Sequence, residues 1–118
     1  MQPISKDLNL NDLLGDYLPQ IRIGKYDVQF CFGCGCVIQS ERKVELINNS
    51  ETITIFDEKW FNIEPLLNII CEEVIHWAIE SEYSFSISFR NGYKIIFYSS
   101  DDPYEDIIIR YKDTMDIF

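Results

Sequence analysis

In two parts of the chain apolar and polar residues alternate with a period of two, the pattern of strands with one buried face. Val28, Phe30 and Phe32 alternate with Gln29 and Cys31, and "SFSISF" from Ser84 repeats the rhythm. The same pattern predicts strands at residues 43–47, 52–56, 93–98 and 107–111. We therefore expect strands within 21–57 and within 84–111.

Between these two parts the period changes from two to about four. Apolar residues surround a polar stripe made of Glu64, Asn68, Glu72, His76 and Glu80. This spacing predicts one α-helix over residues 62–80, with a wide face buried against a sheet. Asn62 suits its N-cap, and Pro65 falls in the first turn, where its missing N–H costs nothing.

The first 20 residues are expected to form a short N-terminal helical segment. Leucines occur there at roughly helical spacing, Gly15 ends the turn that starts at Asn11, and Pro19 keeps the chain extended. Residues 1–118 are then one domain of the α+β class. Its expected architecture is an antiparallel, strongly twisted sheet of six to seven strands, with hairpins before and after one main α-helix that packs on it.

Composition supports one folded domain with an acidic surface. Of the 118 residues 47% are hydrophobic, and 20 acidic against 10 basic residues give a net charge of −10. Such a field repels nucleic acid and anionic membrane and attracts basic partners. We therefore expect no direct nucleic-acid or membrane partner. The alternative is that the acidity only keeps the protein soluble.

The sequence also favours a cytoplasmic location. The N-terminus has no basic segment followed by an apolar run, and no stretch approaches 18 apolar residues. Four cysteines in a chain without an export signal are expected to stay reduced.

Three of these cysteines form the pattern C-x-x-C-x-C in "FCFGCGC" at residues 30–36, which resembles a metal or redox site. A second hairpin suggests how this stretch turns. "SFRNGYKI" at 88–95 fits a three-residue loop with Gly92 in the left-handed conformation, which places Ile87 opposite Ile95 and Phe85 opposite Phe97.

With the same loop at Gly33-Cys34-Gly35, Phe30 faces Ile38 and Phe32 faces Cys36 on the core side. Cys31 then lies on the other face opposite Val37, and Cys34 lies at the tip. The three thiols diverge, whereas a zinc site needs sulfurs that converge at about 2.3 Å from the metal. We expect structural cysteines, with Cys71 a small core residue of the helix, and no metal or cofactor.

No catalytic set can be assembled from the sequence, so we expect no enzyme. Glu72, His76 and Glu80 are interpreted as the solvated stripe of a helix. The run "SSDDPYED" at 99–106 has neither the length nor the glycine of a calcium-binding EF-hand loop. The motif "FGCGC" lies in a hairpin, where a G-x-G carries no nucleotide-binding meaning.

The acidic residues instead indicate a protein that binds a basic partner. They gather in the predicted helix and after residue 99, where aromatic residues could anchor an interface. The candidate partner-binding residues are Asp101, Asp102, Tyr104, Glu105, Asp106, Glu72, Glu73 and Glu80.

The run "SFRNGYKIIFYSSDDPYEDIIIRY" resembles the C-terminal part of immunity proteins from bacterial contact-dependent growth inhibition and related polymorphic toxin systems. The matching features are Phe89, the turn Asn91-Gly92, the strand to Tyr98, Asp101-Asp102 and Tyr104-Glu105. "VQFCFGCGCVIQS" resembles the first hairpin of those proteins, although its cysteines depart from the usual pattern. The likeness covers about half of the chain and lies mostly in strand patterning.

The resemblance implies a cytosolic antidote that binds and blocks a cognate toxin C-terminal domain, commonly a nuclease (for example an RNase) with a basic cleft. The acidic surface suits the same role, because carboxylates can take the place of phosphates in such a cleft. Two other functions remain open at this stage: a cysteine-based metal-binding or redox protein, and an adaptor subunit whose partner is not a toxin.

Overall fold

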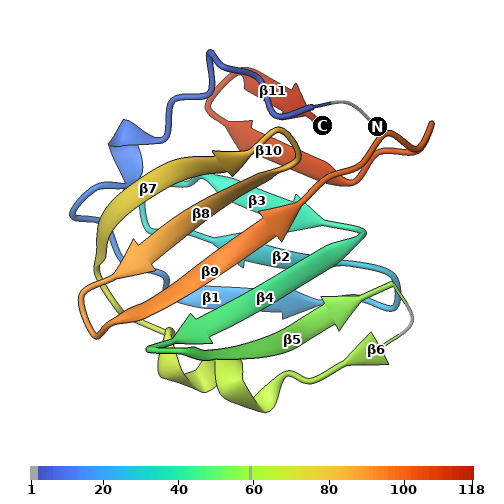
Figure 1. Ribbon diagram of the computed structural model, residues 1–118. Coiled ribbons are helices and arrows are strands. Elements are labelled where there is room, and N and C mark those ends of the chain that lie inside the picture. Colours follow the sequence, from blue (N-terminus) through green and yellow to red (C-terminus); the bar gives the residue numbers. More distant parts are fainter. Residues whose placement is uncertain (1–2, 59) are drawn as a thin grey trace.

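The computed structural model describes residues 3–58 and 60–118, which form two antiparallel sheets packed face to face (Figure 1). The strands of the first sheet, in spatial order, are β1 (Gln20–Ile23), β2 (Val28–Cys31), β3 (Val37–Ser40), β10 (Ile107–Tyr111) and β11 (Thr114–Ile117). Those of the second are β6 (Trp60–Phe61), β5 (Glu51–Asp57), β4 (Lys43–Asn48), β9 (Tyr93–Tyr98), β8 (Ser84–Phe89) and β7 (Val74–Ser81). The fold is a β-sandwich.

The predicted α+β class is therefore wrong, and so is the predicted main helix over 62–80. The helices of the described residues are two short 3₁₀ segments, η1 (Asn11–Leu13) and η2 (Glu64–Asn68). The chain leaves the helical conformation at Cys71, whose φ is +64°. It then enters β7, which lies at one edge of the six-stranded sheet.

Irregular pairing of β7 explains why its sequence resembles a helix. The register with β8 shifts between Val74 and His76 and again between Ile79 and Ser81. A β-bulge adds one residue on one strand, so side chains on the same face become three apart instead of two. Val74 and Trp77 accordingly pair with Phe89 and Ile87, which share a face of β8. This three-residue spacing imitates helical periodicity.

Both predicted hairpins are confirmed. In the first, Phe30 pairs with Ile38 and Cys31 with Val37, and Gly35 has a φ of +97°. In the second, the pairs are Ile87 with Ile95 and Phe85 with Phe97, and Gly92 has a φ of +96°. The short helical turn near Asn11 is also present, followed by Gly15 at a φ of +83°.

Aromatic residues join the two sheets across the core. Phe30 of the first sheet meets Phe97 of the second edge-to-face, with ring centroids 5.2 Å apart. Phe85, the cross-strand partner of Phe97 on β8, stacks on it with ring centroids 5.0 Å apart. All three side chains are fully buried, so the core lies between the inner faces of the sandwich.

The chain crosses between the sheets twice, at the same end of the sandwich. The two-residue link of Glu41 and Arg42 joins β3 to β4, and residues 99–106 join β9 to β10. The amide of Glu41 donates to the carbonyl of Asp106 at 2.8 Å, which places the two crossings side by side. This arrangement brings the acidic run at 99–106 against a turn from the first third of the chain.

A second junction between the sheets lies on another side of the molecule. Here residues 15–18 bond to residues 71–74: Gly15 N–H donates to the Val74 carbonyl, Val74 N–H to Asp16 and Cys71 N–H to Leu18. No helix among the described residues has the length and apolar composition needed to cross a membrane.

Candidate binding surface around the acidic loop

The segment 99–106, here called the acidic loop, is anchored at both ends by backbone hydrogen bonds. At its start the amide of Ser99 donates to the Tyr83 carbonyl at 2.8 Å. At its end the amide of Asp106 donates to the carbonyl of the C-terminal residue, Phe118, at 2.8 Å. The loop therefore leaves the sandwich from fixed points.

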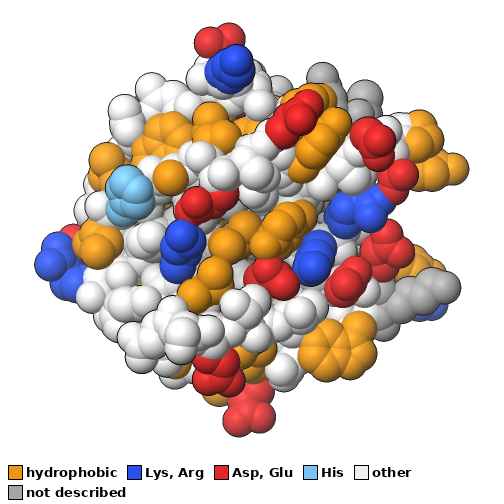
Figure 2. Space-filling model, in the orientation of Figure 1, with side chains coloured by type: hydrophobic (Ala, Val, Ile, Leu, Met, Phe, Trp, Pro, Cys, Tyr) orange, Lys and Arg blue, Asp and Glu red, His pale blue; other side chains and the backbone are white. Residues whose placement is uncertain are grey.

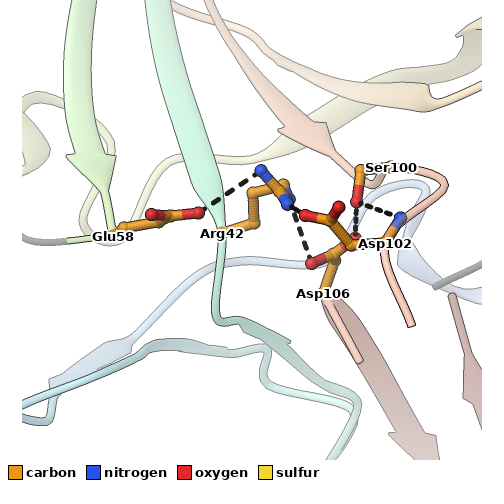
Figure 3. Close-up of polar contacts among 5 residues, drawn as sticks. All are labelled: Arg42, Glu58, Ser100, Asp102 and Asp106. Carbon is orange, nitrogen blue, oxygen red and sulfur yellow. Dashed lines mark hydrogen bonds and ion pairs between the residues drawn. The ribbon is translucent and has the colours of Figure 1, made fainter. Parts of the chain in front are cut away.

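One guanidinium, that of Arg42, holds three carboxylates at the base of this loop (Figure 3). Its Nε donates to Asp106 Oδ1 at 3.1 Å, its terminal nitrogens form ion pairs with Asp102 and Glu58, and the Glu58 contact measures 3.3 Å. The side chain of Arg42 is only 25% exposed, so these contacts are partly shielded from water. Arg42 thus ties the acidic loop to the turn after β5.

Asp106 is the most enclosed acid of the group, with 5% of its side chain exposed. Burial raises the pKa of its carboxyl, but hydrogen bonds from Ser100 and Arg42 help to outweigh this effect, and the pKa lies below its ordinary value. The Ser100 hydroxyl donates to Asp106 Oδ2 at 2.6 Å and accepts the amide of Asp102 at 3.2 Å. Asp106 and Asp102 are therefore engaged in holding the loop's shape.

Other predicted residues of the loop face solvent. Tyr104 is 77% exposed, and Asp101 and Glu105 are exposed beside it in sequence. Tyr104 and Glu105 line a shallow groove together with Pro103 and Glu41. In Figure 2 acidic side chains gather around basic ones at the right of the view, where β9 leads into the acidic loop in Figure 1.

Two acids that the sequence did not single out join this surface. Burial raises the pKa of Glu41, and the nearby charges of Asp27 and Glu105 raise it further. Asp27 precedes β2, whose first residue pairs with the last residue of β3, next to Glu41. We call Asp27, Glu41 and Glu105, together with Tyr104, the acidic rim. Its members come from three separate turns, so no sequence window contains them.

The predicted sites Glu72, Glu73 and Glu80 do not share a helical face: Glu72 and Glu73 precede β7, and Glu80 lies within it. Glu73 Oε2 accepts from Arg90 at 2.7 Å, and this hydrogen bond lowers the pKa of Glu73. Glu80 Oε1 is 2.7 Å from Lys94 Nζ and accepts from Ser86 at 2.6 Å, which lowers its pKa as well. Glu72 is half-buried.

The cysteine-rich hairpin has diverging thiols. Cys31 and Cys36 are buried and Cys34 is exposed at the tip. Burial, with the nearby Cys34 and Asp16, raises the pKa of Cys36 to about 12, and burial also raises that of Cys34. Within the described ranges no three His, Cys, Asp or Glu side chains are arranged to hold a metal ion. The prediction that Cys71 is a core residue is wrong, because it is exposed.

Asp16 holds the tip of the cysteine-rich hairpin in place. Its Oδ2 accepts the amide of Cys34 at 2.8 Å, and the amide of Gly33 donates to the Tyr17 carbonyl at 3.0 Å. The hairpin tip is thereby docked on residues 16–17. The chain matches no protein-family model, no curated protein and no solved structure.

Proposed function

We propose that this chain is a binding protein that uses the acidic rim to recognise a basic protein, and that it acts in the cytoplasm as an immunity protein against a toxin domain of the nuclease type. The observation that carries the proposal is the acidic rim itself: three carboxylates from different turns beside a tyrosine that is 77% exposed. The sequence resemblance to immunity proteins supports the same role.

Electrostatics favour a cationic partner at this surface. Glu41 is partly desolvated and is repelled by Asp27 and Glu105, and the nearby charge of Arg110 offsets only part of this effect, so the pKa of Glu41 is raised. A lysine or arginine placed between these carboxylates relieves that repulsion. The net charge of −10 adds long-range attraction, which raises the rate of association with a basic domain.

The loop is held in shape before a partner arrives. Arg42 connects it to Glu58, and Ser100 closes its interior through Asp106 and the amide of Asp102. A surface that is already ordered loses less conformational entropy on binding. Asp102 and Asp106, which hold the loop in shape, thus support the acids of the rim.

Tyr104 provides the apolar part of the contact. Exposed tyrosines are enriched among the residues that dominate binding energy, because they bury a large ring and keep a hydroxyl for hydrogen bonding. Its position next to Glu105 and across the groove from Glu41 suits a basic residue flanked by an apolar one. The proposed inhibition is occlusion, in which the rim occupies the cleft that would bind phosphates.

The test uses the toxin-like C-terminal domain encoded beside this chain in its genome. We expect co-expression to protect cells from that domain, and the purified proteins to form a complex that blocks nuclease activity. Affinity should fall steeply with salt, because the contact is ionic. If no toxin-like domain is encoded there, or if this protein does not protect against it, the immunity role is wrong.

Charge reversal tests whether the acidic rim, and not another part of the surface, binds the partner. We expect the double variant Glu41→Lys with Glu105→Lys to bind at least about tenfold more weakly, since close charge pairs at interfaces contribute roughly 1.5 kcal/mol or more. The double variant Glu51→Lys with Glu64→Lys is the matched control, because it changes the charge by the same amount at two exposed glutamates away from Glu41, one at the start of β5 and one at the start of η2. Equal losses in both proteins would show a non-specific charge effect and contradict the rim as the interface.

A further inference from the structure

Strand β1 has an unpaired outer edge. It is the outermost strand of the five-stranded sheet and pairs with β2 on one side. The amide of Gly24 donates to the Asp27 carbonyl, and antiparallel pairs alternate in hydrogen bonding. Gln20 and Arg22 therefore direct their backbone groups toward β2, and Ile21 and Ile23 direct theirs outward. Over residues 3–58 and 60–118, no backbone hydrogen bond reaches these outward groups.

An apolar groove runs beside this edge, between β1 and η2. Its lining side chains, here called the β1 groove, are Ile21, Ile23, Ile63, Leu66, Leu67 and Ile70. Three of them are strongly exposed: Leu67 at 75%, Ile63 at 50% and Ile23 at 45%. The volume of 160 Å³ is close to that of a cavity of about 150 Å³ that holds benzene. The β1 groove therefore has room for one aliphatic or aromatic side chain.

One segment of the chain itself already pairs with the residues that precede β1. Residues 71–74 bond to residues 15–18, and the last of these contacts is Cys71 N–H to the Leu18 carbonyl at 2.7 Å. At Cys71 the positive φ of 64° turns the chain away. After Leu18 the chain continues into β1, whereas the segment before Cys71 is η2. The β1 groove opens between β1 and η2. The groove thus begins where an internal strand partner ends.

We propose that the β1 groove binds an extended segment of a partner protein, which adds to β1 as a sixth strand of that sheet. The outward N–H and C=O groups of Ile21 and Ile23 supply the main-chain hydrogen bonds. Alternate side chains of the added strand point into the groove, as in other cases of strand addition. An aliphatic residue at those positions covers the exposed Leu67 and Ile63. Contiguous exposed apolar surface of this kind marks interaction sites.

The positive charges of β1 and the turn after it favour a partner segment that carries an acidic residue. Arg22 lies on the face of β1 opposite Ile21 and Ile23, and its guanidinium donates to the neutral Gln20 amide at 3.5 Å. Lys25 follows in the next turn. A carboxylate on the outer face of the added strand, directly across from Arg22, forms a favourable cross-strand pair. The segment that fits best therefore has aliphatic residues at alternate positions and an acidic residue between two of them.

The same charges disfavour a second copy of this chain. Antiparallel pairing of β1 with itself would bring Arg22 close to Arg22 of the other copy, and each copy carries a net charge of −10. The proposed site lies outside the acidic rim and takes a partner of different chemistry. It goes beyond the proposed function and does not depend on it.

The experiment uses the whole protein and a fluorescein-labelled peptide of the sequence Val-Thr-Val-Glu-Val-Thr-Val, blocked at both ends. We expect saturable binding by anisotropy, and at least several-fold weaker binding when the central Glu of the peptide is replaced by Lys. In hydrogen-exchange measurements by NMR, the amides of Ile21 and Ile23 should exchange at least tenfold more slowly with the peptide bound.

Two variants and a matched control complete the test. Ile23→Asp and Leu67→Asp change exposed side chains of the groove and should each weaken binding at least tenfold. Ile79→Asp changes an apolar residue of similar exposure on β7, at 40%, and should bind as the parent protein does. No binding at 1 mM peptide, equal losses in all three variants, or unchanged exchange at Ile21 and Ile23 would each overturn the proposal. So would a dimer in sedimentation that Ile23→Asp abolishes, because a second copy would then occupy the edge.

Discussion

Arg42 Nε donates a hydrogen bond of 3.1 Å to Asp106 Oδ1, a contact between residues 64 positions apart in the sequence. Each residue lies in one of the two crossings that join the sheets. The contact therefore fastens the crossings to each other, and it closes the base of the acidic loop. The stability of the sandwich and the shape of the proposed binding surface depend on the same side chains.

Removing Arg42 should destabilise the protein through Asp106. Arg42→Met leaves a carboxylate with 5% exposure without its guanidinium partner. Loss of one partner of a buried pair costs about 3 to 5 kcal/mol. Because Arg42 is itself partly exposed and Ser100 still donates to Asp106, we expect a loss of about 2 to 3 kcal/mol in the free energy of unfolding, measured by urea denaturation.

A double-mutant cycle separates this pair from other effects of Arg42. Asp106→Asn should cost less when Arg42→Met is already present, with a coupling free energy above about 1 kcal/mol. Additive losses would contradict a direct role of the Arg42–Asp106 contact and would assign the loss to Asp102 and Glu58.

Removing the charge of Glu41 should stabilise the folded protein. Its folded-state pKa is raised by burial and by Asp27 and Glu105, so its ionised form disfavours folding. Glu41→Gln should therefore increase the free energy of unfolding at pH 7, by up to about 0.5 kcal/mol for a surface position. The gain should shrink as the pH falls through the folded pKa, and vanish below about pH 4, where Glu is protonated in both states.

Asp106 gives the opposite dependence and serves as the control. Its folded-state pKa is lowered, so its contribution is complete above the unfolded pKa of about 3.9 and is lost as the pH falls through the folded pKa. The destabilisation by Asp106→Asn should thus be largest near neutral pH and decrease in acid. Parallel pH profiles for the two variants would contradict the assigned environments.

The four thiols should react in two classes with a disulfide reagent. Cys34 and Cys71 are exposed and should react in the native protein, whereas the buried Cys31 and Cys36 should react only after unfolding. Burial raises the pKa of Cys34, so its rate should still increase when the pH rises above 9. Mass spectrometry of the labelled peptides identifies the sites. Rapid labelling of Cys36 at neutral pH would show that the hairpin opens.

Gly35 should be sensitive to substitution for conformational reasons alone. Its φ is +97°, and an added Cβ would meet no atom within 4 Å. Gly35→Ala should therefore cost about 1 to 2 kcal/mol from backbone strain, without a steric clash. Gly35→Asn should cost less, because asparagine tolerates positive φ better. Equal stability of all three proteins in urea would indicate that the turn adopts another conformation.

The two hairpins could be predicted from the sequence, because each combines strict alternation of apolar and polar residues with a glycine at the turn. Phe85, Ile87 and Phe89 mark one face without interruption, and Gly92 provides the left-handed position. Such local signals fix the register, since a shift of one residue would expose the apolar face. The same reasoning predicted that the thiols of Cys31, Cys34 and Cys36 diverge.

The sequence was insufficient where non-local pairing altered the local pattern. The bulge of β7 between Val74 and His76 gave Val74 and Trp77 a helix-like spacing, and only the pairing with β8 reveals it. Short strands such as β1 and β11 lacked enough residues to show a period. The acidic rim draws on turns at Asp27, Glu41 and Glu105, so the sequence identified two of its four members, Tyr104 and Glu105, and missed the two brought there by β2 and β3.

The order of strands along the chain also has a consequence for how the protein folds. Strands β4 to β9 form one sheet from one uninterrupted stretch of chain, whereas the other sheet needs β10 to pair with the second edge of β3, where Ser40 pairs with Ile107. Contacts that are close in sequence close smaller loops and form faster. We expect pulse-labelled refolding to protect the amides that link β8 to β9 before the amides that link β3 to β10. On a ribosome, the five-stranded sheet could be completed only after β11 (Thr114–Ile117) had emerged.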